Sequence, residues 1–143
     1  MNLRLYKSPY FDPVYPHIRR LLFEGQVPAD EKGYDADFYI YVWLTVDGYL
    51  HAFQAVLGDT ITLAFQMPDR MSYGRLSRDI INRGVTTRET SAERSQLISV
   101  IDKATSDSFP ALLESIKCIV NGEHLDTVSL SKQEMAVFDT LCK

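Results

Sequence analysis

The chain has little of several features that would indicate its function directly. It contains two cysteines, Cys118 and Cys142, which are too few for a disulfide-built fold and suit a reducing compartment. No uncharged apolar run reaches the roughly 18 residues that span a bilayer. The opening stretch, MNLRLYKSPYFDPVYP, lacks the apolar core of a secretory signal. We therefore expect a cytoplasmic protein with no membrane partner.

The familiar motifs of catalytic and cofactor sites are also missing. The sequence has no GxGxxG or phosphate-binding glycine loop, no CxxC pair, no HExxH and no GxSxG. Its three histidines, His17, His51 and His124, show no spacing that would suggest a zinc site. We predict no cofactor, no metal and no catalytic residue.

The composition is that of an ordinary globular protein. At 143 residues, the length predicts a single domain over residues 1–143. The 45% share of hydrophobic residues is too high for a disordered chain. The formal net charge of −4 argues against a nucleic-acid partner.

Three β-rich runs follow one another in the middle of the chain. FYIYVWLTV (38–46) and YLHAFQAVL (49–57) are separated by Asp47–Gly48, and TITLAFQM (60–67) follows Gly58–Asp59. Asp-Gly between such runs is a strong hairpin signal. The sequence therefore predicts an antiparallel meander.

Turns of two residues would fix the register of this meander. They would place Leu44 opposite His51 and Phe53 opposite Ala64, and directly opposed residues point to the same face. One of the two faces would then be apolar on all three runs, so we expect that face to carry the helices.

The expected helix-covered face includes an aromatic row on the first run, Tyr39, Tyr41 and Trp43. The first run is apolar on both sides, which is typical of an interior strand. We therefore expect a further strand beside it, from either 3–6 or 124–130.

Apolar periodicity predicts about five helices in the rest of the chain. The expected helices span residues 12–25, 70–83, 90–104, 108–121 and 131–142. Thr90 with Glu93 and Ser131 with Glu134 match the capping box that opens a helix. The predicted fold class is α+β: an antiparallel three- to four-stranded meander with about five helices packed mainly on one face.

Acidic residues are concentrated in one segment. Residues 24–59 hold seven acidic side chains against a single lysine. Within that segment a tyrosine is surrounded by carboxylates, which suits docking to a basic partner. The candidate partner-binding residues are Asp30, Glu31, Tyr34, Asp35 and Asp37.

Arginines are concentrated in another segment, residues 70–94, which holds six of them against three acidic residues. The six are Arg70, Arg75, Arg78, Arg83, Arg88 and Arg94. Two of these side chains could hold a phosphate or carboxylate, or they could pair with the neighbouring acids on a solvated surface.

A small acidic chain without a catalytic motif favours a non-catalytic protein-binding module. The hypothesis is a small bacterial inhibitor or immunity-type protein that neutralises a partner protein, with a basic, toxin-like protein as the partner. The alternative is a small enzyme or ligand sensor whose site is assembled from distant residues: His51, the arginines of Arg70–Arg94, and the aromatic row.

Overall fold

The computed structural model describes residues 1–6, 9–11, 14–27, 36–58, 61–76, 85–87 and 91–142. Within these ranges it has eight strands and three α-helices. The strands are β1 (Arg4–Leu5), β2 (Tyr10–Phe11), β3 (Ile18–Val27), β4 (Ala36–Thr45), β5 (Leu50–Leu57), β6 (Ile61–Gln66), β7 (Arg70–Leu76) and β8 (Val85–Thr87). The helices are α1 (Ser91–Lys103), α2 (Pro110–Val120) and α3 (Lys132–Leu141).

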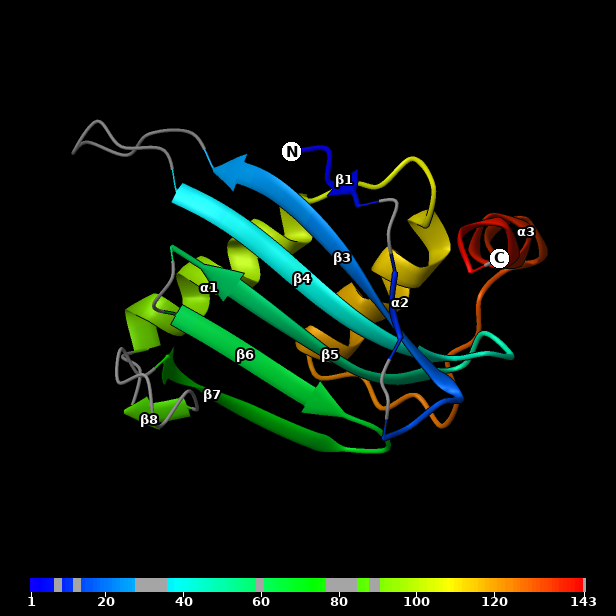
Figure 1. Ribbon diagram of the computed structural model, residues 1–143. Helices are drawn as coiled ribbons and strands as arrows, with labels where there is room; N and C mark the ends of the chain where they lie inside the picture. Colours follow the sequence, from blue (N-terminus) through cyan, green and yellow to red (C-terminus); the bar gives the residue numbers. More distant parts are fainter. Residues whose placement is uncertain are drawn as a thin grey trace.

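All the strands belong to one antiparallel sheet (Figure 1). The six strands β3 to β8 pair in sequence order as one meander, and the short strands β1 and β2 both pair with the outer side of β3. Each strand of the meander thus lies beside its neighbour in the sequence, which is the usual arrangement of consecutive strands.

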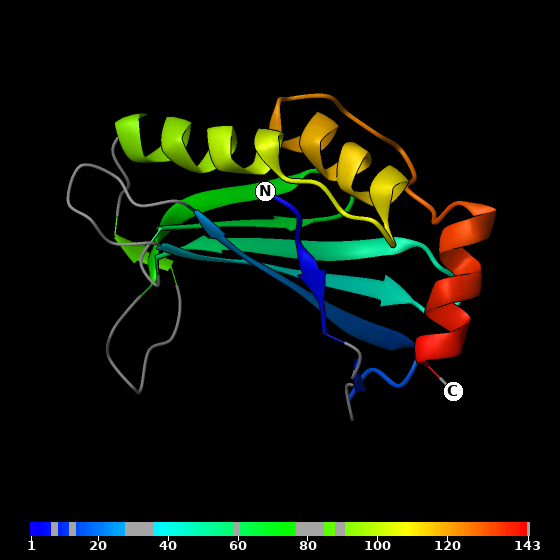
Figure 2. The same ribbon diagram turned by 90° about the horizontal axis from the view of Figure 1, so that it is seen from above.

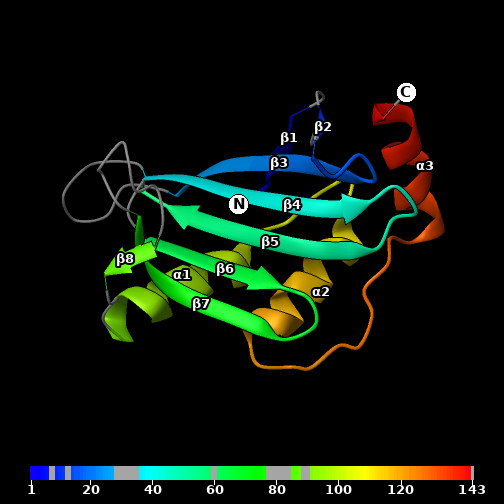
Figure 3. The ribbon, with the colours of Figure 1, turned by 60° about the horizontal axis from the view of Figure 1, so that its bottom comes forward.

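The helices cover one face of this sheet. Figure 2 shows α1 and α2 side by side along that face, while α3 stands across the end of the sheet next to the β4–β5 turn. A long connection joins α2 to α3 around the edge of the molecule (Figure 3). In the described part of the chain no helix lies over the opposite face.

The predicted three- to four-stranded meander with about five helices is wrong. The segment 12–25 was expected to be helical, yet its second half belongs to β3, whose ten residues all pair with β4. Leu21 and Phe23 face the core at a spacing of two, while Leu22 between them is half-buried. The apolar spacing of this segment fits a helix as well as a strand, and pairing with β4 decides between them.

The expected helix over 70–83 is also wrong where the structure describes it. Residues 70–76 form β7, which pairs with β6 from Gln66↔Arg70 to Ile61↔Arg75. The short turn at residues 67–69 returns the chain beside β6 at once, so pairing overrides the helical spacing. Residues 77–83 lie outside the described ranges.

The β4–β5 hairpin differs from the two-residue prediction only beside its turn, and Val42 pairs with Phe53 as a two-residue turn requires. Leu44 pairs with Leu50 and not with His51, and a β-bulge separates this pair from Trp43↔Ala52. The turn is longer than the two residues predicted. The hydrogen bond that the Thr45 N–H donates to the carbonyl of Tyr49, at 2.8 Å, shows this. The β-bulge compensates for the longer turn, so the pairs from Trp43↔Ala52 to Phe38↔Leu57 keep the register that a two-residue turn predicts.

The β5–β6 hairpin is shifted by one residue from the prediction: Phe53 pairs with Phe65 and not with Ala64. Their rings stack at a centroid distance of 5.2 Å inside the core. The core-facing set of β4 consists of Phe38, Ile40, Val42 and Leu44, each no more than 1% exposed.

The prediction of the helix-covered face is also wrong, although the pairing of β4 with β5 groups its side chains as expected. The aromatic row Tyr39, Tyr41 and Trp43 is half-buried and points away from α1 and α2. Tyrosine and tryptophan carry polar tips, so they tolerate partial exposure better than phenylalanine and isoleucine do. This difference places the purely aliphatic and phenyl side chains under the helices.

Neither candidate extra strand pairs with β4, because β3 occupies that edge. Of the segment 3–6, the residues Arg4–Leu5 form β1 and pair with β3. The segment 124–130 instead contacts the start of β5: the Leu50 N–H donates to the carbonyl of Val128 at 2.8 Å.

One helix start can be compared with a capping prediction. The Ser131–Glu134 capping box of α3 is confirmed, with both reciprocal hydrogen bonds present. Before α2, the residue at the N-cap is Phe109, whose N–H donates to the hydroxyl of Ser106 at 3.1 Å. Thr90, the expected cap of α1, lies outside the described ranges.

Candidate functional site

The sheet face opposite α1 and α2, which we call the open face, holds the groups best placed for binding. Side chains alternate between faces along a strand, so the register of β3 to β7 defines its members. They are Arg20, Leu22, Glu24, Gln26, Asp37, Tyr39, Tyr41, Trp43, Ala52, Gln54, Val56, Thr62, Ala64, Gln66, Arg70, Ser72 and Gly74.

Over β5, β6 and β7, the open face is exposed mainly at the end nearest the β4–β5 turn. Val56 and Thr62, toward the other end, are 6% and 0% exposed. Gln66, Arg70 and Ser72 are all exposed. A ligand that reached this face would therefore meet the end that contains Trp43.

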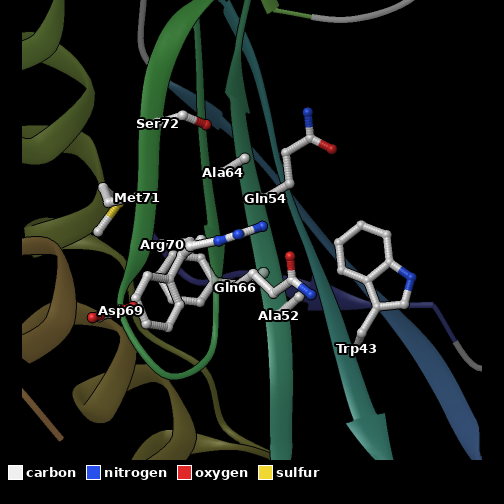
Figure 4. Close-up of a pocket in the computed structure, with 11 residues that line it drawn as sticks. Trp43, Ala52, Gln54, Ala64, Gln66, Asp69, Arg70, Met71 and Ser72 are labelled. Atoms are coloured by element: carbon white, nitrogen blue, oxygen red, sulfur yellow. The ribbon is translucent and has the colours of Figure 1, made fainter.

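A hollow of about 600 Å³ lies at this end (Figure 4). Ala52 and Ala64 lie at its floor, because their methyl groups leave space between longer neighbours. Trp43 stands on the β4 side and Arg70 reaches in from β7, so the hollow spans the four strands β4 to β7.

The polar side chains around the hollow have unused hydrogen-bonding capacity. Gln54 donates from its amide to the hydroxyl of Thr62 at 3.1 Å, which leaves the amide carbonyl of Gln54 without a partner in the described part of the chain. The side chains of Trp43, Gln66 and Arg70 make no hydrogen bond with described residues. These groups are therefore available to a ligand.

Arg70 is the cation of the hollow. Its neighbour Asp69 also lines the hollow but forms no ion pair with it. Figure 4 shows the guanidinium of Arg70 directed toward Gln54 and Gln66, whereas the carboxylate of Asp69 points the opposite way. The positive charge of Arg70 therefore faces the hollow without a partner among the described residues.

The aromatic row continues from the hollow along β4. The rings of Tyr41 and Trp43 have centroids 6.3 Å apart, and the guanidinium carbon of Arg20 lies 5.2 Å from the centroid of Tyr41. At the far side of the open face, Arg4 forms an ion pair with Glu24. The row is thus held by neighbours on both sides.

Of the predicted partner-binding residues, only Asp37 lies within the described ranges. It is exposed near the start of β4, at the opposite end of that strand from Trp43. The amide of Gln26 donates to its carboxylate at 3.5 Å. Asp30, Glu31, Tyr34 and Asp35 lie outside the described ranges.

The predicted arginine clamp is not assembled by the described residues. Arg70 points into the hollow, whereas Arg94 lies on α1 with its guanidinium carbon 4.2 Å from the ring centroid of Tyr73. The structure describes Arg75 only by its backbone pairing with Ile61. Arg78, Arg83 and Arg88 lie outside the described ranges.

The alternative site built on His51 is only partly brought together. His51 is exposed at the bulge of β5 and does not line the hollow, although Trp43 and Arg70 do. His124 contacts Asp126 at 3.0 Å instead. Among the described residues, no group of three or more histidine, cysteine or acidic side chains is placed to hold a metal ion.

The two thiols stay in their protonated form more readily than free cysteine. Burial raises the pKa of Cys118, and Glu123 raises it further. Burial also raises the pKa of Cys142, with Arg19 acting in the opposite direction. A raised pKa lowers the thiolate fraction, which is the reactive form.

The sequence analysis did not identify Gln54, Gln66 and Ser72 as site residues. Their signal would have been polar side chains at matching positions on three neighbouring strands. The shifted register concealed this signal, because it placed Ala64 opposite Phe53, whereas Ala64 pairs with Gln54.

No protein-family model, curated protein or solved structure matches this chain. None of the helices within the described ranges has both the length and the apolar character to cross a membrane.

Proposed function

We propose that the chain is a non-catalytic protein-binding module of the inhibitor or immunity type, which neutralises a partner protein. The observation that supports it is the open face, where half-buried aromatic side chains lie with no helix of the described chain over them. Tyrosine and tryptophan are enriched in protein interfaces, because they combine large apolar area with a polar tip.

The rigidity of this surface also suits recognition. The aromatic row lies on β4, which is paired along its length with β3 on one side and β5 on the other. A side chain held in place before binding loses little conformational entropy when the partner arrives. The open face therefore favours a specific contact.

The acidic stretch of residues 24–59 has a separate role in this proposal. Its excess of negative charge attracts a basic partner over long range and raises the association rate. We assign this steering to Asp30, Glu31, Asp35 and Asp37, with Tyr34 as a docking side chain among them.

The test of the contact surface compares captured partners. The native chain, the open-face variant Tyr41→Ala and the control Tyr15→Ala are used as baits in extracts of the source cell. Tyr15 is 58% exposed and lies outside the open face, which makes it a matched aromatic control. We expect a partner that binds the native chain and the control but is lost with Tyr41→Ala, while circular dichroism shows all three folded.

The test of the steering role uses the captured partner. Reversing the charges of Asp30, Glu31, Asp35 and Asp37 together should slow association and flatten its dependence on salt. Association rates at two salt concentrations measure this. Unchanged rates would mean that the acidic stretch is only a solvated surface.

The binding hypothesis also makes a statement about catalysis. Replacing His17, His51, His124, Cys118 or Cys142 with alanine should leave the biological activity intact when the fold survives. Loss of activity in a stable His51→Ala variant would favour the enzyme alternative.

A further inference from the structure

We infer that the hollow receives the carboxylate side chain of an aspartate or glutamate presented by a segment of the partner protein. This inference rests on the proposed function and names the chemistry of the partner's contact residue. The lining residues that carry it are Trp43, Gln54, Gln66, Arg70 and Ser72, over the floor of Ala52 and Ala64.

Hydrogen-bond donors dominate the hollow. Arg70 offers a guanidinium, Gln66 an amide N–H₂ and Ser72 a hydroxyl, and all are without partners among the described residues. The indole N–H of Trp43 points away from these side chains (Figure 4). A guanidinium can only donate. A ligand that satisfies this set must supply acceptor oxygens, and a carboxylate supplies the most in the smallest volume.

Charge complementarity selects the ionised acceptor. Arg70 brings a positive charge that no described carboxylate neutralises, and Asp69 points away from it (Figure 4). Guanidinium and carboxylate form paired, charge-assisted hydrogen bonds that are stronger than neutral ones. The acidic stretch steers the whole partner over long range, whereas Arg70 selects one residue at contact.

The shape of the hollow favours a protein segment over a small free molecule. The hollow is open and lies on a sheet face that continues past Trp43 to Tyr41. Enclosed pockets bury most of a small ligand's surface, but an open hollow leaves room for the chain on either side of the bound side chain. The indole of Trp43 provides an apolar wall for an aliphatic neighbour of the carboxylate.

The single tryptophan of the chain makes this site directly observable. Trp43 lines the hollow, so a change in tryptophan fluorescence on adding a ligand reports a change in the surroundings of this one side chain. The probe is the blocked peptide acetyl-Ala-Leu-Glu-Leu-Ala-amide, titrated against its glutamine counterpart. We expect a saturable change with the glutamate peptide and at least an about tenfold weaker response with glutamine.

Two variants separate charge from shape. Arg70→Gln removes the cation and should weaken binding of the glutamate peptide about tenfold, to the level of the glutamine peptide. Ala64→Val keeps the charge but fills the floor of the hollow, and it should weaken binding of both peptides. The matched controls are Arg94→Gln on α1 and Ala136→Val on the exposed side of α3, which should bind as the native chain does.

Several results of these titrations would overturn the inference. Equal binding of both peptides, or native affinity in Arg70→Gln, would show that no carboxylate is recognised. Free succinate binding as tightly as the peptide would make the hollow a small-molecule site, and preference for a single-stranded RNA oligonucleotide would assign another class of partner. If neither peptide binds while Tyr41→Ala still abolishes capture of the partner, the inference about the carboxylate is rejected and the proposed contact surface stands. If Tyr41→Ala captures the partner as the native chain does, the proposed contact surface is rejected.

Discussion

Among the described residues, Glu134 is the only charged residue that is buried, at 1% exposure. Its carboxylate accepts hydrogen bonds from the Leu112 N–H at 3.0 Å and the Ser131 N–H at 2.9 Å. These donors belong to the first turn of α2 and the N-cap of α3. One carboxylate therefore satisfies donors at the starts of two helices, where the helix dipoles favour negative charge.

This arrangement predicts a large stability cost for removing the carboxylate. Glu134→Ala should lower the free energy of unfolding by about 3 kcal/mol, because the buried Leu112 N–H and the partly buried Ser131 N–H lose a charged acceptor. Glu134→Gln keeps one acceptor oxygen, so its loss should be smaller. Urea unfolding measures both.

A matched carboxylate on α2 provides the control. Glu114 is exposed and pairs with Lys117 at 3.1 Å. Surface pairs contribute little, so Glu114→Ala should change stability by less than about 0.5 kcal/mol. Equal effects at Glu114 and Glu134 would contradict the bridging role of Glu134.

The two thiols give a second prediction at this scale. Burial is the main cause that raises the pKa of both Cys118 and Cys142. At pH 8 each should react with iodoacetamide more slowly in the folded protein than in urea, because less thiolate is present. Mass spectrometry of timed samples measures the rates, and a thiol equally fast in both states would refute this.

At the scale of elements, the β4–β5 turn depends on one glycine. Gly48 has φ of +86°, and a Cβ atom added there would lie 2.6 Å from the sulfur of Met135. Gly58, at the end of β5, has φ of +63° but nothing within 4 Å of its Cβ position. At both positions a side chain would strain the left-handed backbone, but only at Gly48 would it also meet a neighbouring side chain.

We therefore expect Gly58→Val to cost about 1–2 kcal/mol from the left-handed backbone alone, and Gly48→Val to cost more. Shortening Met135 in the double variant Gly48→Val with Met135→Ala should recover part of the difference, because it removes the contact. Urea denaturation midpoints of the native chain, Gly58→Val, Gly48→Val and the double variant test this. The turn assignment fails if Gly48→Val leaves the midpoint unchanged.

Local signals in the sequence predicted some elements well. Ser131 and Glu134 define the start of α3 through two hydrogen bonds within four residues, so no distant contact is needed. The Asp47–Gly48 signal likewise marks a true turn, with Gly48 at positive φ. These features follow from chemistry that lies within a few neighbouring residues.

Other elements depend on contacts that a single sequence does not display. The apolar residues of β3 suit a helix or a strand, and only pairing with β4 decides. The β5–β6 register differs by one residue from that of a two-residue turn, with Phe53 opposite Phe65, and no residue type signals this. This one-residue shift determines which side chains of β6 share a face with those of β5.

The candidate site shows the same limit. Trp43 and Arg70 were recognisable by type, but they come together only because β4 to β7 lie side by side. Gln54 and Gln66 are ordinary surface residues until the register places them around the floor of Ala52 and Ala64.

At the scale of the whole molecule, the sheet and helices share one buried cluster. Leu44 and Leu50 at the β4–β5 end, Leu112 of α2 and Phe138 of α3 all belong to it. Although α3 stands at the end of the sheet, Phe138 is 1% exposed. We therefore expect α3 to unfold together with the rest.

Two optical probes can test this, because they report different layers. Fluorescence of Trp43 follows the open face of the sheet, and circular dichroism at 222 nm follows the helices. In a cooperative two-state transition both give the same midpoint. Phe138→Ala should cost about 3–5 kcal/mol by leaving a cavity, and it should move both midpoints equally. If only the helical signal moved while the Trp43 transition stayed in place, α3 would be an independent appendage, and the open face would rest on β3 to β7 with α1 and α2 alone.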